Sequence, residues 1–171
     1  MSITTKIIIT DTNIITDLDI AGVLDKFVEL DNVYISDMVL HDEINEKTGN
    51  YEVIKKMKVI KSSAEQLVEM QKLLMDTKKL SPYDLINYIL AHDNDSILAT
   101  GDNLLRSYAI ENGVTVIRTL KIIQLMVEYD VICCEEAINA CNLLLNSNKT
   151  RIPEQSIMDV IQELKKMLVI E

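Results

Sequence analysis

Near its start the sequence has a short β-branched run, Lys6-Ile7-Ile8-Ile9-Thr10, which stops at the polar turn Asp11-Thr12-Asn13. An apolar run of this length between polar flanks is typical of a buried strand. Apolar residues then recur at helical spacing between Ile20 and Leu30. This part of the chain therefore predicts a strand, a turn and a helix, in that order.

The same alternation continues along the chain. Further strands are predicted at 33–35, 58–60, 97–100 and 114–117. Helices between them are predicted around 38–44, 64–76, 82–90 and 104–110. Strands that alternate with helices form right-handed βαβ units. The expected fold is therefore a three-layer α/β/α arrangement with a mainly parallel central sheet.

Beyond the last predicted strand the sequence is helical, at about 120–128, 135–145 and 154–168. The last helix has a strong apolar stripe, which either covers the sheet or forms a dimer contact: Ile157, Val160, Ile161, Leu164 and Leu168. We expect residues 1–171 to form a single domain. Residues 120–171 would be its helical C-terminal extension, packed on the core or used for dimerisation.

The composition fits a compact chain with an aliphatic core, because 48% of its 171 residues are hydrophobic and 4% are aromatic. No apolar run approaches the roughly 20 residues of a membrane-spanning helix. The N-terminus lacks the pattern of a signal peptide. Cys133, Cys134 and Cys141 lack disulfide or zinc-site spacing, which favours buried free thiols. We therefore expect a cytoplasmic protein with no membrane partner.

The net charge of −10 weakens the case for tight, non-specific DNA binding, because phosphate affinity usually comes from Lys and Arg. It weakens the case for a metal-dependent nuclease less, because carboxylates that hold divalent cations make the net charge of the chain more negative until metal binds. The densest basic patch either guides RNA or forms a solvated face, and the second interpretation is favoured. This patch comprises Lys55, Lys56, Lys58 and Lys61.

Four acidic residues stand where a parallel sheet gathers its functional groups, beyond the carboxyl ends of its strands. Asp11 and Asp102 end predicted strands, Glu43 lies in the helix after the second strand, and Asp84 lies in the first turn of a helix. Each also has a structural explanation, as a helix cap, a capping-box acid or a solvated helical acid. Asp17 is explained by a turn or capping role. Clustered carboxylates repel one another, so the joint arrangement of the four favours a cation site.

Four segments around these acids resemble the motifs of the PIN domain family. Ile7–Asn13 is similar to its opening strand and Asp-x-Asn/Ser turn, and Val33–Ile44 to its second strand and Glu-bearing helix. Leu80–Ala91 resembles its third acidic motif, and Ala99–Asp102 its strand-terminal T-x-D signature. The match runs from about residue 6 to 117, and the closest branch is the prokaryotic one related to toxin–antitoxin (VapC-like) ribonucleases.

The resemblance implies a ribonuclease that hydrolyses phosphodiester bonds of single-stranded RNA with Mg²⁺ or Mn²⁺. Asp11, Glu43, Asp84 and Asp102 would be its catalytic residues. Asp11 and Asp102 would be the primary metal ligands. Asp84 and Glu43 would bind metal directly or through water, and one of them would help to activate the attacking water. The branch often has a Glu where Asp84 stands, and this shorter side chain would alter the metal distances.

The resemblance also implies supporting residues and partners. Asn13 and Thr100 would orient the acids by hydrogen bonds. Asn103 stands where the branch often has a second Asp, and its amide can still coordinate or hydrogen-bond. Arg106 would either bind a substrate phosphate or pair with the acids, and the pairing is favoured. The implied partners are RNA, an antitoxin protein if the chain is a toxin, and a second copy in a homodimer.

The main alternative is a PIN domain with little or no nuclease activity that binds RNA or a protein, because Asn103 lowers the charge of the site. A phosphoacceptor receiver domain also gathers acids at strand ends. It would normally have a Lys after the last strand, where this chain has Arg118. A nucleotide-binding Rossmann domain would need a G-x-G-x-x-G turn, which the sequence lacks.

Overall fold

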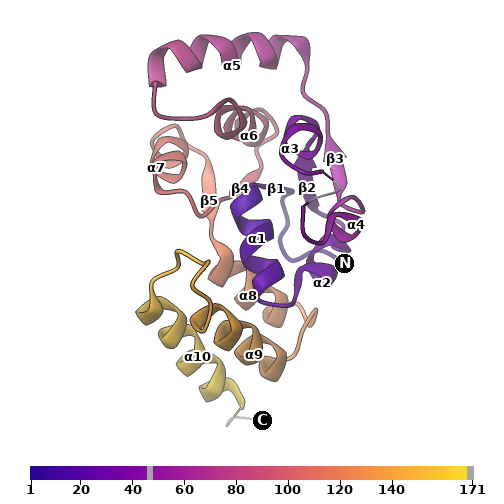
Figure 1. The fold of residues 1–171 in the computed structure, drawn as a ribbon, viewed down its shortest axis with the longest axis vertical. Helices are drawn as coiled ribbons and strands as arrows, with labels where there is room; N and C mark the ends of the chain where they lie inside the picture. The colour runs from indigo at the N-terminus through magenta and orange to yellow at the C-terminus, as the bar shows by residue number, and fades with distance from the viewer. Residues whose placement is uncertain (46–47, 169–171) are drawn as a thin grey trace.

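A computed structural model describes residues 1–45 and 48–168, in which a five-stranded sheet lies between two layers of helices (Figure 1). The strands are β1 (Ile8–Thr10), β2 (Val33–Ser36), β3 (Lys58–Ile60), β4 (Ile97–Ala99) and β5 (Thr115–Ile117). The helices are α1 (Thr12–Ile20), α2 (Leu24–Val28), α3 (Asp37–Asp42), α4 (Tyr51–Ile54), α5 (Ala64–Thr77), α6 (Pro82–Asp93), α7 (Asn103–Glu111), α8 (Thr119–Glu128), α9 (Cys134–Leu145) and α10 (Glu154–Leu168). The predicted three-layer α/β/α fold is confirmed.

The sheet is parallel throughout, in the order β3-β2-β1-β4-β5. In β1, Ile8 pairs with Val33 on one side and with Ile97 on the other. The chain builds outward from β1 to β3 on one side, and then places β4 and β5 on the other side. The order therefore reverses between β1 and β4, which is where open α/β sheets form their functional crevice.

Alternate strand residues face opposite layers, as the two-residue period of a strand requires. Ile8 and Ile97 are buried in one core, with residues of α1, α2, α8, α9 and α10. Ile9 and Leu98 are buried in a second core, with residues of α5, α6 and α7. The inner strands β1 and β4 are thus covered on both faces, which explains why they read as continuous apolar runs in the sequence.

The segment after β1 differs from the prediction of a turn at 11–13 and one helix between residues 20 and 30. Helix α1 begins at Thr12, because the Asp11 carboxylate accepts the Thr12 N–H and caps the helix. It ends before Gly22, whose φ of +72° lies in the left-handed region that favours glycine. A second short helix, α2, follows. Residues 12–20 therefore belong to a regular helix that begins at the carboxyl end of β1.

The C-terminal helices pack on the α1 side of the sheet, and α10 lies along α9 (Figure 1). The apolar stripe of α10 contributes Ile157, Val160, Ile161 and Leu164 to the same core that contains Ile8. The single domain and a dimer contact through these helices stay predictions. Across the described residues, every helix is too short or too polar to cross a membrane.

The cysteines differ in part from the prediction of three buried thiols. Cys134 and Cys141 are buried in α9, but Cys133 is exposed. It occupies the N-cap position of α9, where its backbone N–H donates to the Glu136 carboxylate at 2.9 Å. A residue that begins a helix stands outside the helical repeat, so the apolar pattern of α9 does not bury it.

Candidate active site

Asp11 lies at the carboxyl end of β1 and is only 6% exposed. Its Oδ2 accepts hydrogen bonds from Asn13 Nδ2 at 2.9 Å and Thr100 Oγ1 at 2.8 Å, and its Oδ1 accepts the Thr12 N–H. Burial raises the pKa of Asp11 to about 6, and the charges of Asp84 and Glu43 add to the rise, although the hydrogen bonds from Thr100 and Thr12 oppose it. Asp11 is therefore a buried carboxylate that has two other acids near it and forms no ion pair with a Lys, Arg or His of the described residues.

Asp84 and Glu43 both use one carboxylate oxygen for a local hydrogen bond. Asp84 is the acid of a capping box at the start of α6, where its Oδ2 accepts the Ser81 N–H at 2.8 Å. Glu43 was expected within the helix after β2, but α3 ends at Asp42 and Glu43 caps its C-terminus. Its exposed side chain accepts the Thr12 hydroxyl through Oε2 at 2.6 Å. The structure thus brings Asp84 and Glu43 close enough to act on Asp11.

Asp102 is joined to Asp11 through Thr100. The Thr100 hydroxyl donates to Asp11 and accepts the Asp102 N–H at 3.1 Å. In the same turn, Gly101 donates its N–H to Asn13 Oδ1 at 2.8 Å. The Asp102 carboxylate itself caps α7 by accepting the Leu105 N–H through Oδ1. Asn13 and Thr100, both predicted to orient the acids, therefore lock the ends of β1 and β4 together.

The donor set fits a divalent cation chemically, since Mg²⁺ and Mn²⁺ prefer oxygen ligands. Asp84 Oδ1, Asp102 Oδ2 and Glu43 Oε1 accept no hydrogen bond from the described residues, so each acid keeps an oxygen for a ligand. Within residues 1–45 and 48–168, however, no three acidic, His or Cys side chains lie close enough to share an ion. A cation at Asp11 would have to draw these oxygens inward.

The remaining predicted residues lie on α7. Asn103 is its first residue and lines a pocket beside Asp102. Arg106 is exposed one turn further along the helix. The favoured pairing of Arg106 with the acids is absent, because none of the four is within ion-pair distance of it in the described structure.

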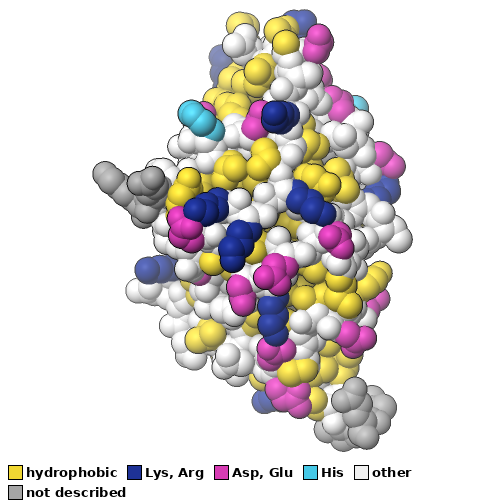
Figure 2. Space-filling view, turned by 90° about the vertical axis from the view of Figure 1, so that its right-hand side faces the viewer, with side chains coloured by type: hydrophobic (Ala, Val, Ile, Leu, Met, Phe, Trp, Pro, Cys, Tyr) yellow, Lys and Arg dark blue, Asp and Glu magenta, His cyan; other side chains and the backbone are white. Residues whose placement is uncertain are grey.

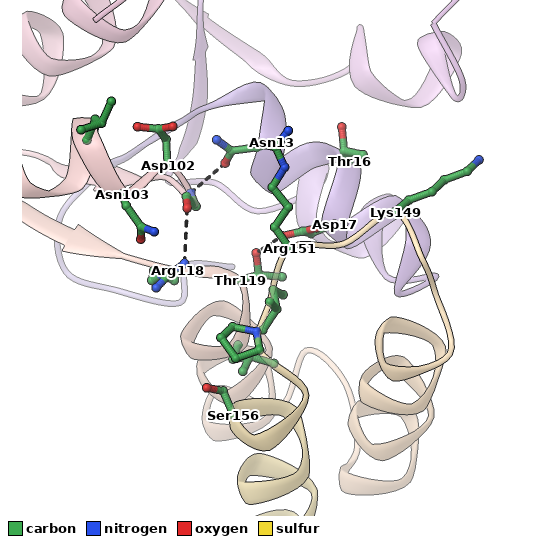
Figure 3. A pocket seen from close by; sticks show the side chains of 15 residues that line it. Asn13, Thr16, Asp17, Asp102, Asn103, Arg118, Thr119, Lys149, Arg151 and Ser156 are labelled. Carbon is green, nitrogen blue, oxygen red and sulfur yellow. Dashed lines mark hydrogen bonds between the residues drawn. The ribbon is translucent and has the colours of Figure 1, made fainter. Parts of the chain in front are cut away.

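The pocket, of about 680 Å³, opens between α1, the start of α7 and the loop from α9 to α10 (Figure 3). Three cationic side chains line it, none of which was predicted as a site residue: Arg118, Lys149 and Arg151. Asp17 also lines the pocket and is buried. It accepts hydrogen bonds from the hydroxyls of Thr119 at 2.8 Å and Thr150 at 3.1 Å. The turn or capping role predicted for Asp17 is therefore wrong, because its carboxylate ties the C-terminal segment to α1.

The basic patch of residues 55–61 is a mixed surface. Lys55 pairs with Glu52, and Lys58 lies 3.4 Å from an Asp31 oxygen. On the side of the molecule that Figure 2 shows, Lys and Arg side chains alternate with Asp and Glu. This arrangement supports the interpretation as a solvated face.

The fold and these residues define an α/β protein with carboxylates at the switch point of a parallel sheet. A family model described as "PIN domain" matches residues 7–166, so the chain belongs to the PIN domain family. The match includes α8 to α10, beyond the segment that contains the four motifs. PIN domains are generally nucleases, and hence hydrolases.

The crystal structure of PAE2754 from Pyrobaculum aerophilum is similar to this chain, with a TM-score of 0.51 and 16% identity. The similarity covers 71% of this chain and 90% of that chain. At this identity it shows a shared fold and nothing about activity. No curated protein matches the sequence.

Proposed function

We propose that this PIN domain is a ribonuclease that hydrolyses single-stranded RNA with the help of Mg²⁺ or Mn²⁺. The observation that carries the proposal is the state of Asp11, a buried carboxylate held by Asn13 and Thr100 beside Asp84 and Glu43. A protein maintains such uncompensated charge at a cost in stability, and perturbed acids of this kind concentrate at functional sites. A divalent cation would offset the charge.

Asp11 and Asp102 would be the primary ligands, since they follow the neighbouring strands β1 and β4 and share Thr100. Asp84 and Glu43 would supply additional oxygens, directly or through water. When bound, Mg²⁺ or Mn²⁺ supplies a Lewis acid for the scissile phosphate and makes a nearby water more acidic. The chain itself fixes Asp11 through Asn13 and Thr100, so this carboxylate needs no reorientation to bind.

A carboxylate must also accept the proton of the attacking water. Glu43 is suited to this role because its side chain is exposed and its Oε1 accepts no hydrogen bond from the described residues. Asp84 is the other candidate, because its Oδ1 also accepts no hydrogen bond from the described residues. Thr12 would hold the opposite oxygen of Glu43 and so aim Oε1 at the site.

Cleavage of an unstructured RNA oligonucleotide tests the proposal. We expect cleavage with Mn²⁺ or Mg²⁺, its loss in EDTA, and a loss of at least about a hundredfold in Asp11→Asn and Asp102→Asn, since each removes a charged ligand. Glu111→Gln, on the exposed side of α7, is the matched control and should cut like the wild type. Equal cleavage by both site variants would show that the activity belongs to another site or to a contaminant.

A binding module on the same fold is the second candidate, and the neutral Asn103 beside Asp102 favours it. Calorimetric titration with Mn²⁺ separates the two. A chain that does not bind Mn²⁺ and does not cut RNA, but still binds RNA, would be such a module.

A toxin role, with an antitoxin as protein partner, is a further part of the proposal and is supported only by the resemblance to the toxin–antitoxin branch. Expression of the chain alone should then arrest growth, and co-expression of a neighbouring small gene should relieve the arrest. Normal growth during expression would contradict the toxin role.

A further inference from the structure

The pocket next to Asp102 has a basic wall that the four acids do not explain. We name it the basic pocket, defined by Arg118 at the end of β5 and by Lys149 and Arg151 in the loop between α9 and α10. Figure 3 shows the Arg151 side chain extending toward Asn13, while Lys149 points outward at the rim. Asp102 and Asn103 border the same pocket. The basic wall therefore adjoins the candidate active site.

The cationic groups of this pocket are available to a ligand. Lys149 and Arg151 form no side-chain hydrogen bond or ion pair with the described residues. Among the residues that the structure describes, Arg118 donates to the Gly101 carbonyl alone, at 3.3 Å. Some surface cations, such as Lys6 and Lys26, pair with an acid and others do not; these three differ from the others in lining one pocket together. In a chain of net charge −10, such unpaired cations favour an anionic ligand.

Asp17 does not cancel this positive charge in the way an ion pair would. Its carboxylate lies in the pocket lining, but it is 9% exposed and accepts the hydroxyls of Thr119 and Thr150. These bonds hold the α9–α10 loop against α1, and so position Arg151. Asp17 therefore fixes the wall and leaves the guanidinium free.

A nucleic-acid strand is the ligand that this arrangement suits. A phosphodiester chain approaching four carboxylates is repelled by them, so cations placed beyond the acids are needed to hold it. Arg presents a planar fork that matches a phosphate group. The apolar side chains of Leu104 and Ile152 in the same lining offer contact to a ribose or base. The volume of about 680 Å³ accommodates a nucleotide-sized group.

We infer that the basic pocket binds a backbone phosphate of the RNA strand adjacent to the bond at the acidic site, with Arg151 as the main contact and Arg118 as the second. Lys149 adds attraction at the rim. The inference rests on the proposed RNA substrate. It gives the loop between α9 and α10 a substrate-binding role in addition to its packing against α1.

Equilibrium binding of a labelled single-stranded oligouridine, followed by fluorescence anisotropy in EDTA, tests this inference without cleavage. Arg151→Gln should weaken binding about tenfold, as expected for one charge-assisted contact. It should also lower the slope of log affinity against log salt by about 0.7, the value for one phosphate on a single strand. Arg151→Lys keeps the charge and should retain most of the slope.

Lys166→Gln is the matched control, because it removes one exposed positive charge from α10 outside the pocket. It should change the affinity less than twofold. Equal effects of Arg151→Gln and Lys166→Gln, or no RNA binding by the wild type, would overturn the inference. Coincident thermal unfolding of the variants checks that the loop substitution leaves the fold intact.

The cleavage assay keeps this inference distinct from the proposed function. If the wild type cut RNA and Arg151→Gln bound RNA as tightly as the wild type, the result would contradict the inferred phosphate subsite and leave the proposed nuclease activity standing. If Arg151→Gln lost RNA binding but the wild type did not cut RNA, the result would contradict the proposed nuclease activity and leave the phosphate subsite standing.

Discussion

Replacing Asp11 by Asn removes a buried negative charge from the metal-free protein and should change how its stability depends on pH. The carboxyl group has an ordinary pKa of 3.8 and a folded-state pKa of about 6. At about 1.4 kcal/mol per pKa unit, this difference corresponds to about 3 kcal/mol. Because Asp11 is only 6% exposed, little of this energy is lost to solvent screening.

The sign follows from a folded pKa that lies above the unfolded one. Below about pH 4 Asp11 is protonated in both states and costs nothing, whereas above about pH 6 it is charged in both and the full penalty applies. The wild type should therefore lose about 3 kcal/mol relative to Asp11→Asn as the pH rises through this window. The variant also changes the hydrogen bonds to Thr12 and Thr100, but that offset is independent of pH and cancels in the comparison.

Urea unfolding in EDTA at pH 4, 5, 6 and 7 measures this difference. Glu111→Gln removes an exposed carboxylate from α7 and serves as the control for the loss of one negative charge. If the free-energy gap between wild type and Asp11→Asn stayed constant across this range, Asp11 would not be an uncompensated buried acid. The observation that supports the metal site would then be lost.

Four further substitutions test how the C-terminal segment is held. Asp17→Ala should lower the free energy of unfolding by about 2–4 kcal/mol, because the buried Thr119 hydroxyl loses its acceptor; Thr150→Val, which removes one weaker bond, should cost about 1 kcal/mol. Leu164→Ala should cost about 2–4 kcal/mol in urea unfolding, since Leu164 is 2% exposed. Met158→Ala, at an exposed site of the same helix, should change stability by less than about 0.5 kcal/mol. Equal losses at residues 158 and 164 would contradict the packing of α10.

Much of the fold was predictable because its signals are local. The apolar runs at β1 and β4 are buried on both faces, and Ser81 with Asp84 forms the capping box that the residue spacing indicates. The capping explanation and the site explanation of the acids proved compatible. Asp11 caps α1 with one oxygen and is held by Thr100 through the other.

The basic pocket was not predictable, because its residues meet only through tertiary packing. Arg151 lies in a polar loop between two helices, and nothing in its neighbours indicates that this loop packs near Asn13. The burial of Asp17 has the same origin, since its partner Thr150 is 133 residues away. Helical periodicity predicts that the apolar face of α10 is buried, but it does not predict the position of the loop between α9 and α10.

The bonds of Asp17 to Thr119 and Thr150 join residues that are made far apart in time, because chains emerge from the ribosome N-terminus first. The four acids are all present once residue 102 has been made, and β1 can then pair with β4. The wall that contains Arg151 is added only after residue 150 follows. A nascent chain therefore acquires its carboxylate edge well before its cationic wall, and a chain that ends early has the first without the second.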